Sequence, residues 1–465
     1  MDTKKLRQKI LDLAIHGKLV PQDPNDEPAS VLLERIRAEK EHLIKEGKIK
    51  APKKSKSAGD TSHYPKDVPF EVPEGWEWTT IGDVFIHNTG KALNSADREG
   101  RLLPYITTSN LYWDRFELST LKKMLFTEDE LEKCTARKGD LLVCEGGDIG
   151  RAAIWNQDYE IRIQNHIHKL RGLGGVNHRL FMFWLMYMKE EGMIGGKGIG
   201  LMGLSSRELD KLLIPLPPLC EQSHLVDKID GLFSVVSRIE KTETVLFETV
   251  SIAKSRILDL AIHGKLVPQD PSDEPVIELL KRINPDFKPS DNLHYEGIVP
   301  AGWQLCQLSD LFKITLGQSP DGSSLNHKSG IEFHQGKICF TEKYLTESGI
   351  FTSCPTKCAE PNSLLCCVRA PVGVFNITTR RICIGRGLCS LSPLDLDVDI
   401  EYWFYALCSL TEYYEGKATG STFKAISGDI IRNTVIAVPP KMEQKRIRKQ
   451  ITRLFSVLKE VADTI

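Results

Sequence analysis

The chain contains the same fifteen residues twice. ILDLAIHGKLVPQDP occupies residues 10–24 and returns, letter for letter, at residues 257–271 of a 465-residue sequence. Further matches follow each copy, and they come in the same order: LLERI and LLKRI, PEGWEWTTIGDVF and PAGWQLCQLSDLF, IPLPPLCEQSHLVDKIDGLFSV and IAVPPKMEQKRIRKQITRLFSV. Self-similarity of this extent indicates a duplicated architecture. A helical segment and a globular unit therefore alternate, and then alternate again.

The repeat divides the chain into seven predicted segments. They are an N-terminal helical segment (1–36), a charged linker (37–72), a first globular unit (73–217), a central helix (218–264), a helical appendage with a linker (265–299), a second globular unit (300–439) and a C-terminal helix (440–465). The linker is rich in Lys and lacks a counterpart of similar length in the second copy, which leaves open a loose contact with DNA phosphates.

Composition narrows the class of protein. Hydrophobic residues make up 41% of the chain and charged residues 26%, as in ordinary globular proteins, and a chain this long needs more than one core. No apolar run approaches the roughly 20 residues of a membrane span, and the N-terminus has no apolar signal region. We therefore expect a soluble, cytoplasmic protein.

The 12 cysteines are irregularly spaced, and most of them crowd between Cys306 and Cys408 among aliphatic residues. This distribution favours reduced thiols packed as small hydrophobic side chains. CPTKC and the adjacent pair Cys366 and Cys367 do not form the two matched CxxC pairs of a structural zinc site, so we expect no metal.

A seven-residue pattern runs from Leu219 to His263. Its two apolar positions hold Ile229, Leu232, Val236, Ile239, Leu246, Val250, Ala253, Ile257 and Leu260, and only Glu243 interrupts them. A sustained heptad predicts one long helix of a coiled coil, here about 65 Å at 1.5 Å per residue. Such a helix needs a partner.

The partner is expected in the same chain. A heptad at the C-terminus holds Ile447, Ile451, Leu454, Leu458, Val461 and Ile465, and Leu6, Ile10 and Leu13 correspond by repeat to Ala253, Ile257 and Leu260. Placed end to end and antiparallel to the central helix, the two terminal segments would complete a coiled coil with pseudo-twofold symmetry. The alternative is that each helix packs on its own neighbouring globular unit.

Between framework pieces the two globular units diverge freely, as expected of two recognition modules with different targets. Motifs for catalysis are weak. GIGLMG at residues 198–203 fits a dinucleotide pattern but does not follow a strand, and NPDF from Asn284 only partly matches the base-holding motif of aminomethyltransferases. His166 and His168 lack a third ligand. We expect no catalytic residue, no bound cofactor and no metal in this chain.

Polar and basic loops do recur at matching places in the two units. Lys197 and Lys417 suit phosphate contacts, whereas Asn165, Arg369 and Arg386 carry forked groups that can read base edges in the major groove. The full set of candidate DNA-binding residues is Lys91, Asn110, Arg151, Asn165, His168, Lys197, Ser205, Gln318, Ser319, Arg369, Arg386, Lys417, Thr419, Ser421 and Lys424.

With its repeats and its PPLCEQ and PPKMEQ junctions, the chain resembles the specificity subunits of type I restriction-modification systems over nearly its whole length. The resemblance implies an α+β protein with two α/β target-recognition domains, separated by a long antiparallel coiled coil of spacer helices with pseudo-twofold symmetry. Each domain would read one half of a split, asymmetric DNA site, and the coiled coil would set the gap. The variable domains do not align residue by residue with the family.

The resemblance also implies partners. Two modification subunits carrying S-adenosylmethionine would dock on the spacer helices, and restriction subunits would cleave DNA with ATP and Mg²⁺, while this chain directs both reactions without catalysing either. The net charge of -1 argues against tight DNA binding by the chain alone. Two other interpretations stay open: a coiled-coil adaptor that binds proteins and not DNA, and a fused DNA methyltransferase.

Overall fold

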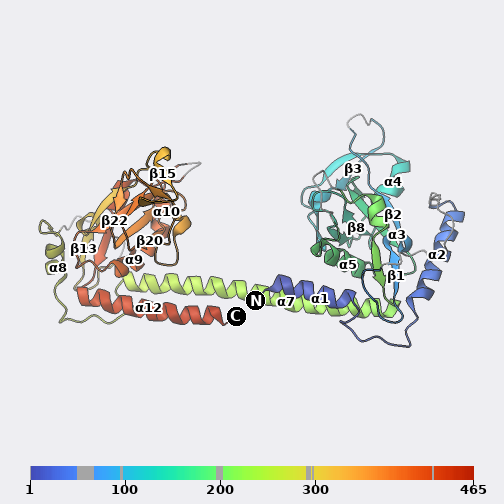
Figure 1. Cartoon of the computed structure of the whole chain (residues 1–465), viewed down its shortest axis with the longest axis horizontal. Coiled ribbons are helices and arrows are strands. Elements are labelled where there is room, and N and C mark those ends of the chain that lie inside the picture. Colours follow the sequence, from blue (N-terminus) through green and yellow to red (C-terminus); the bar gives the residue numbers. More distant parts are fainter. Residues whose placement is uncertain are drawn as a thin grey trace. The chain divides into compact units, whose positions relative to one another are not determined.

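The structure is a computed structural model that describes residues 2–49, 68–94, 98–194, 203–289, 295, 298–420 and 424–464. The chain forms two compact units, unit 1 (Met1–Thr242) and unit 2 (Glu243–Ile465). Each unit has its own large hydrophobic core. The expected division into two mixed α/β domains joined by a long helix is confirmed (Figure 1).

Unit 1 combines helices with short strands. Its helices are α1 (Thr3–Ile15), α2 (Ala29–Lys45), α3 (Ile81–Val84), α4 (Glu128–Cys134), α5 (His178–Glu190), α6 (Ser206–Asp210) and the first part of α7 (Leu219–Ile262). Its strands are β1 (Glu77–Thr80), β2 (Phe85–Thr89), β3 (Arg101–Ile106), β4 (Leu111–Tyr112), β5 (Arg115–Phe116), β6 (Lys122–Phe126), β7 (Thr135–Ala136), β8 (Leu141–Cys144), β9 (Ala152–Ile154), β10 (Ile161–Ile163), β11 (Ile167–Gly172) and β12 (Leu213–Leu216).

Unit 2 follows the same order. Besides the second part of α7, its helices are α8 (Val276–Ile283), α9 (Ile400–Cys408), α10 (Thr411–Lys417), α11 (Gly428–Arg432) and α12 (Lys441–Asp463). Its strands are β13 (Gln304–Gln307), β14 (Phe312–Leu316), β15 (Leu325–Asn326), β16 (Ile331–His334), β17 (Phe351–Thr352), β18 (Cys358–Ala359), β19 (Ser363–Cys367), β20 (Phe375–Thr378), β21 (Ile382–Ile384), β22 (Leu388–Pro393) and β23 (Val435–Val438).

The main sheets of the two units correspond in strand order, although the described part of unit 2 has no counterpart of the two-stranded sheet β4-β5 of unit 1. The sheet order β2-β11-β8-β9 in unit 1 matches β14-β22-β19-β20 in unit 2, and β6-β3-β10-β7 matches β17-β16-β21-β18, to which β15 is added. Even the parallel pairing recurs, since β3 pairs in parallel with β10 and β16 with β21. In both units the first and last strands pair antiparallel, β1 with β12 and β13 with β23. The duplication in the sequence is thus a duplication of the fold.

Helix α7 confirms the heptad prediction. It runs from Leu219 to Ile262, one residue short of the expected end. Every residue at the two heptad positions from Ile229 to Leu260 is buried or half-buried, whereas most residues between them are exposed. This stripe is the pattern that a coiled-coil seam requires.

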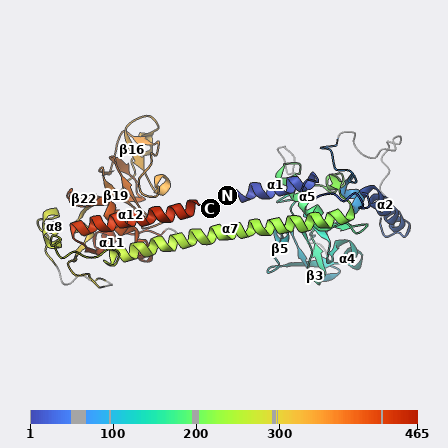
Figure 2. The same ribbon diagram turned by 90° about the horizontal axis from the view of Figure 1, so that it is seen from below.

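Helix α1 runs antiparallel to the first part of α7 in unit 1 (Figures 1 and 2). Near the start of α1, the Arg7 guanidinium donates to Glu240 over 3.0 Å and lies over the ring of Phe233. After the end of α1, Gln22 reaches back to Glu221 in the first turn of α7. Residue numbers therefore increase along α1 as those of the contacting residues of α7 decrease, so the two helices are antiparallel.

Helix α12 has the same relation to the second part of α7 in unit 2 (Figure 2). Lys254 lies over the ring of Phe455, and Arg446, nearer the start of α12, pairs with Asp273 beyond the end of α7. Antiparallel helix pairing is thus confirmed within each unit. The alternative interpretation also holds in part, because α1 packs on α5 and α12 packs on α9 of their own units. The end-to-end placement of the terminal segments stays a prediction.

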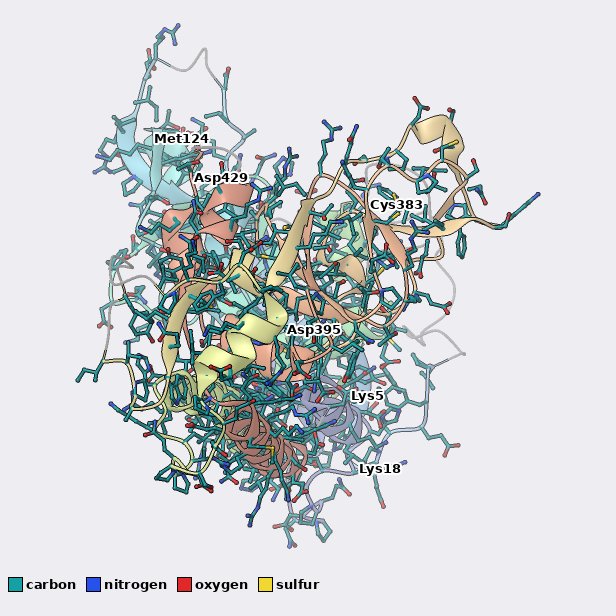
Figure 3. All side chains as sticks on the ribbon, turned by 90° about the vertical axis from the view of Figure 1, so that its left-hand side faces the viewer. Lys5, Lys18, Met124, Cys383, Asp395 and Asp429 are labelled. Carbon is teal, nitrogen blue, oxygen red and sulfur yellow. The ribbon has the colours of Figure 1, made fainter. Side chains whose placement is uncertain are left out.

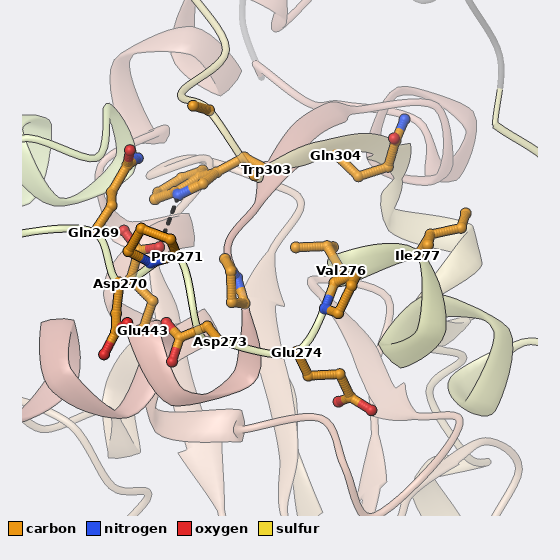
Figure 4. Close-up of a pocket in the computed structure, with 14 residues that line it drawn as sticks. Gln269, Asp270, Pro271, Asp273, Glu274, Val276, Ile277, Trp303, Gln304 and Glu443 are labelled. Carbon is orange, nitrogen blue, oxygen red and sulfur yellow. Dashed lines mark hydrogen bonds between the residues drawn. The ribbon is translucent and has the colours of Figure 1, made fainter.

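A Trp–Glu hydrogen bond fastens each globular unit to its helix. Trp76 Nε1 donates to Glu221 at the start of α7 over 2.8 Å, and Trp303 Nε1 donates to Glu443 at the start of α12 over 3.1 Å. All four side chains are buried. Figure 4 shows the second bond at the wall of a pocket of about 500 Å³. The PPxxEQ junction therefore has a structural reason for its glutamate.

The glutamine of the same junction ties the first turn of the helix to the proline that follows the last strand. Gln222 Nε2 donates to the Pro217 carbonyl over 3.0 Å, and Gln444 Nε2 donates to the Pro439 carbonyl over 2.9 Å. These bonds hold the last strand of each unit against the helix that follows it.

None of the helices in the described part of the chain combines the length and the apolar character that crossing a membrane requires.

Candidate nucleic-acid interface

Four loops of unit 2 meet at one end of the β14-β22-β19 sheet. The Gln318 amide, just after β14, donates to the Ile384 carbonyl over 2.9 Å, and the Arg386 amide donates to the Ser319 hydroxyl over 3.4 Å. The Val368 amide, at the end of β19, donates to the Gly387 carbonyl over 3.0 Å. Backbone bonds thus join loops that lie far apart in the sequence.

A fourth loop closes this set. The Ile426 amide donates to the Val368 carbonyl, and the Ala370 amide donates to the Lys424 carbonyl. Ala425 bridges to both Arg369 and Thr419. Six of the candidate residues therefore lie on one connected group of loops, which we call the unit 2 loop cluster: Gln318, Ser319, Arg369, Arg386, Thr419 and Lys424.

The side chains of this cluster are available to a ligand. All of its candidate residues are exposed apart from half-buried Ser319. Lys417, at the end of α10 just before Thr419, is also exposed and lies over the ring of Tyr413 at 5.6 Å. The cluster thus brings guanidinium, amide, ammonium and hydroxyl groups together on a rigid sheet end. Ser421 lies outside the described residues.

Unit 1 has the same loop scaffold. The Lys91 amide donates to the Ile163 carbonyl as Gln318 does to Ile384, and the Glu145 amide donates to the His166 carbonyl as Val368 does to Gly387. The Leu204 amide donates to the Glu145 carbonyl, which matches the bond from Ile426 to Val368. Lys91, Asn165 and Ser205 lie on this unit 1 loop cluster, whereas Lys197 lies outside the described residues.

A glycine opens each cluster, and a close approach of the backbone requires it. A Cβ atom on Gly90 would lie 2.1 Å from the Ile163 carbonyl oxygen, and one on Gly317 would lie 2.1 Å from the Gly385 oxygen. Any other residue would force these strand ends apart. The glycines therefore keep the first loop of each cluster tight against the next.

Several unit 1 candidates bind within the protein. The Lys91 ammonium donates to Glu130 over 2.7 Å and to the Leu125 carbonyl, with a tenth of its side chain exposed. Arg151 donates to the Thr108 carbonyl over 2.7 Å and lies over the ring of Tyr112. These cations hold neighbouring segments in place. Asn165 is half-buried, and its amide is exposed beside His166.

Two predicted DNA-contacting residues are corrected by their burial. Asn110 is 7% exposed, and its amide caps its own turn and donates to the Glu117 and Thr120 carbonyls. His168 is fully buried. Ser205 caps the start of α6 together with Glu208, although it lies closer to the surface. The sequence predicts DNA contacts here because the side chains are polar and lie in variable segments, but Asn110 and His168 make hydrogen bonds inside the protein.

His168 belongs to a hydrogen-bonded chain that the sequence did not reveal. Its Nε2 donates to the Leu204 carbonyl over 2.7 Å, its Nδ1 lies 2.9 Å from His87 Nε2, and His87 Nδ1 donates to Asp210 over 2.6 Å. Burial, together with the neighbouring His87, lowers the pKa of His168 to about 4. A neutral His168 with its proton on Nε2 donates to the Leu204 carbonyl and so holds Leu204, the residue before Ser205, in the unit 1 loop cluster.

The missed members of the clusters carry no sequence signal. Thr356 donates its hydroxyl to the Gln318 carbonyl, although the two residues are not near each other in the chain. His87 and Asp210 likewise act on His168 across long separations. Within the described residues no three His, Cys, Asp or Glu side chains form a group that could hold a metal ion.

Two copies of one fold, each with a polar loop cluster at the same sheet end, define a duplicated recognition protein. Residues 73–246 and 300–463 match the family model of the type I restriction modification DNA specificity domain. The chain therefore belongs to this family.

Relatives in sequence agree with this. The chain is 30% identical over 389 residues to the type I restriction enzyme EcoAI specificity subunit of Escherichia coli, an alignment that covers 68% of the chain and 63% of that protein. It thus spans less than two thirds of the length of that relative. Against the putative type I restriction enzyme MjaX specificity subunit of Methanocaldococcus jannaschii, identity is 28% over 412 residues, with 85% and 90% covered.

Solved structures share the fold. One solved structure is described as "Structural basis underlying complex assembly and conformational transition of the type I R-M system". A chain of that structure superposes on this chain with a TM-score of 0.65 at 23% identity, covering 85% of this chain and 94% of that one. The HsdS subunit from Thermoanaerobacter tengcongensis gives a TM-score of 0.50 at 22% identity, with 84% and 93% covered.

Proposed function

We propose that this chain is the DNA-reading subunit of a type I restriction-modification complex, and that each unit reads one half of a bipartite, asymmetric site. The observation that carries the proposal is the pair of loop clusters. The same backbone bonds present them at the same sheet end in both units, whereas their side chains differ. A shared scaffold with unlike readers suits two unlike half-sites.

Within unit 2 the proposed division of work follows the chemistry of the side chains. Arg369 and Arg386 can donate two parallel hydrogen bonds to a guanine, and Gln318 can pair with an adenine. Lys417 and Lys424 suit phosphate oxygens, which position a protein without reading sequence. Thr419 and Ser319 can donate to either. The exposure of these groups on the unit 2 loop cluster supports the assignment.

In unit 1 the proposed readers are fewer, because part of the set lies outside the described residues. Asn165 is half-buried in the unit 1 loop cluster, with its amide exposed beside His166, and can pair with an adenine. Lys91 and Arg151 are proposed to position the loops rather than to touch bases, since both already bind acceptors in the fold. Lys197 of unit 1 and Ser421 of unit 2 lie outside the described residues, and their contacts with DNA stay predictions.

The proposed role of α7 is to set the gap between the half-sites and to bind the modification subunits. A helix of 44 residues rises about 66 Å at 1.5 Å per residue. It exposes Val235, Val245, Phe247 and Ile252, of which Ile252 is 70% exposed. Exposed apolar side chains on a helix favour protein partners. A pocket of about 460 Å³ beside Phe404, Tyr405 and Phe455 adds apolar surface in unit 2.

The chemistry is proposed to reside on the partners. S-adenosylmethionine would bind to two modification subunits and ATP with Mg²⁺ to restriction subunits, in the cytoplasm, while this chain supplies the sequence specificity and no catalytic group. Base flipping for methylation would then occur on the partner, next to the loop clusters that hold the duplex.

Mapping of methylated adenines tests the proposal. Genomes from cells with and without this gene are compared, and one split motif that disappears with the gene is expected. The purified chain mixed with S-adenosylmethionine and DNA should transfer no methyl group. Footprinting of the chain with its co-expressed partners should protect two short segments with an unprotected gap. An adaptor that does not bind DNA would protect neither segment. A methyltransferase would methylate DNA without any partner subunit.

A further inference from the structure

Cys358 and Cys383 are direct neighbours across two antiparallel strands. Strand β18 pairs with β21, and Cys358 and Cys383 are Cα partners in that pairing. The Ile384 amide donates to the Lys357 carbonyl over 2.8 Å, so the flanking pair of residues is the hydrogen-bonded one. Cys358 and Cys383 therefore form a non-hydrogen-bonded pair, for which Cα atoms lie about 4.5 Å apart with both side chains on one face.

This spacing suits a disulfide. Bridged cysteines have Cα atoms roughly 4.4–6.8 Å apart, and the pair falls at the short end of that range. Both cysteines are free thiols, with Cys358 half-buried and Cys383, labelled in Figure 3, buried. The sulfur of Cys358 is the one that a small oxidant can reach.

Unit 2 contains a second cross-strand pair that serves as an internal comparison. Cys366 and Cys389 are Cα partners on β19 and β22. Two residues along, the Val368 amide donates to the Gly387 carbonyl, which makes this a hydrogen-bonded pair with Cα atoms about 5.5 Å apart. Both side chains are fully buried. This second pair is wider and closed to solvent.

We propose that Cys358 and Cys383 are an oxidation site. A low-molecular-weight disulfide such as oxidised glutathione oxidises the two thiols, which then form a cross-strand disulfide with each other. The Cys358 thiolate attacks one sulfur of glutathione disulfide, the S–S bond breaks, and one glutathione leaves as a thiolate that takes up a proton. The Cys383 thiolate then attacks the Cys358 sulfur and expels the second glutathione. Two protein thiols are oxidised by two electrons, and one glutathione disulfide is reduced to two thiols.

The pair responds to pH in a defined direction. Burial and the neighbouring Cys383 raise the pKa of the Cys358 thiol. The thiolate is the nucleophile, so the reaction is slow at neutral pH and accelerates as the pH rises. The Arg381 side chain also faces Cys358 and opposes part of this shift, while Glu360 adds to it.

The disulfide would act on the unit 2 loop cluster. Ile384, next to Cys383, accepts the Gln318 amide, and Arg386 follows two residues later. Thr356, two residues before Cys358, donates to the Gln318 carbonyl and lies 3.9 Å from the Cys383 sulfur. A disulfide brings Cβ atoms to about 3.8 Å, closer than unbridged partners. This shift moves the backbone that presents Gln318 and Arg386. Its effect on DNA rests on the proposed function, whereas the bond itself does not.

The first experiment tests the bond. The full-length chain is incubated with glutathione disulfide at pH 8, alkylated, digested with trypsin and analysed by mass spectrometry. The expected product links the peptide of residues 358–369 to that of residues 382–386, and fragmentation before Pro361 assigns the link to Cys358. Cys358→Ser and Cys383→Ser should each abolish it, whereas Cys354→Ser and Cys366→Ser should leave it. Glutathionylation of exposed Cys220 without this link, or a link from Cys358 to Cys354, would overturn the proposal.

The second experiment tests the coupling. The complex with its modification subunits is titrated with a duplex that carries its mapped methylation site. Oxidation should weaken binding about tenfold, the effect of losing one base contact, and dithiothreitol should restore it. Cys358→Ser should bind equally before and after oxidation. A formed disulfide with unchanged binding refutes the coupling. Absence of specific binding in the reduced protein refutes the proposed function and leaves the result on the bond standing.

Discussion

The indole nitrogen of Trp303 lies 3.1 Å from Glu443 Oε2, and this bond joins the second globular unit to the first turn of α12. Burial raises the pKa of Glu443, partly offset by the Trp303 bond. Among the described residues the other oxygen, Oε1, has no hydrogen-bond partner. In unit 1 the equivalent Glu221 also accepts Gln22 over 3.2 Å. Among the described residues, Glu221 thus accepts from two side chains, Trp76 and Gln22, whereas Glu443 accepts from Trp303 alone.

This difference predicts unequal effects of one substitution. Trp303→Phe removes the one donor to Glu443 among the described residues and should cost about 1–3 kcal/mol locally, because the carboxyl group stays buried. Trp76→Phe should cost less, since Glu221 keeps Gln22. Hydrogen–deuterium exchange of the first turns of α12 and α7 measures both. Equal loss of protection in the two variants would contradict the proposed asymmetry.

Acid should weaken unit 1 through His168. Its pKa falls from 6.5 to about 4 in the folded protein, so the folded state binds fewer protons than the unfolded state in that range. The corresponding stability is present above pH 6.5 and is lost as the pH falls towards 4, by at most about 3 kcal/mol. His168→Gln keeps a donor for Leu204 and should lack this dependence. Exchange of the β11 amides from pH 7 to 4 compares the two, and parallel curves would contradict the assignment.

Arg380 should matter more to unit 2 than a surface cation does. It donates to buried Glu332 from Nε over 2.6 Å and from Nη2 over 3.0 Å. Burial works to raise the pKa of Glu332, but Arg380, the Ser348 amide and His334 outweigh it and lower the pKa to about 2. Arg380→Met should therefore cost about 2–3 kcal/mol, below the range for fully buried pairs because Arg380 is a third exposed.

The same ion pair gives a pH test. The folded pKa of Glu332 lies below the ordinary value of 4.5, so its contribution is present above pH 4.5 and is lost as the pH falls towards 2. Urea unfolding should show the advantage of the wild-type chain over Arg380→Met shrinking in that window. Arg381→Met, which removes an exposed pair with Glu360 and a side chain that faces Cys358, is the matched control and should change stability little.

Lys417 should affect DNA affinity without affecting sequence preference. A phosphate contact contributes equally to all sequences, so Lys417→Ala in the assembled complex should weaken binding to specific and unrelated duplexes alike. The slope of log affinity against log salt should fall by about 1. Binding titrations at several salt concentrations measure this. A loss confined to the specific duplex would instead assign Lys417 to base reading.

The periodic and repeated parts of the chain were predictable. The seven-residue pattern from Leu219 to His263 predicted α7 to within a residue, because every third or fourth position had to be apolar to bury one stripe. The matching segments at the start and end of each globular unit predicted two copies of one fold. Such features depend on neighbours in the sequence, which periodicity reports directly.

The side-chain networks were not predictable, because their members meet only after folding. Lys169 is 1% exposed and donates to the carbonyls of Glu132, Lys133 and Thr135 at the end of α4, yet in the sequence it looks like a surface lysine. His168, which the sequence predicts as a DNA contact, is buried as well, and His87 and Asp210, which form a hydrogen-bonded chain with it, lie far from it in the sequence. By contrast, Gln318 and Arg386 lie in separate stretches of the sequence, and the fold brings their loops together.

Separate reading of two half-sites is tested most directly by methylation mapping of the double variant Arg369→Ala/Arg386→Ala. Both side chains belong to the unit 2 loop cluster, so methylated adenines should still lie in a split motif with one half unchanged. The other half should become degenerate at one or more positions, by roughly tenfold or more in preference for each lost base contact. An unchanged motif, or equal relaxation of both halves, would contradict the account.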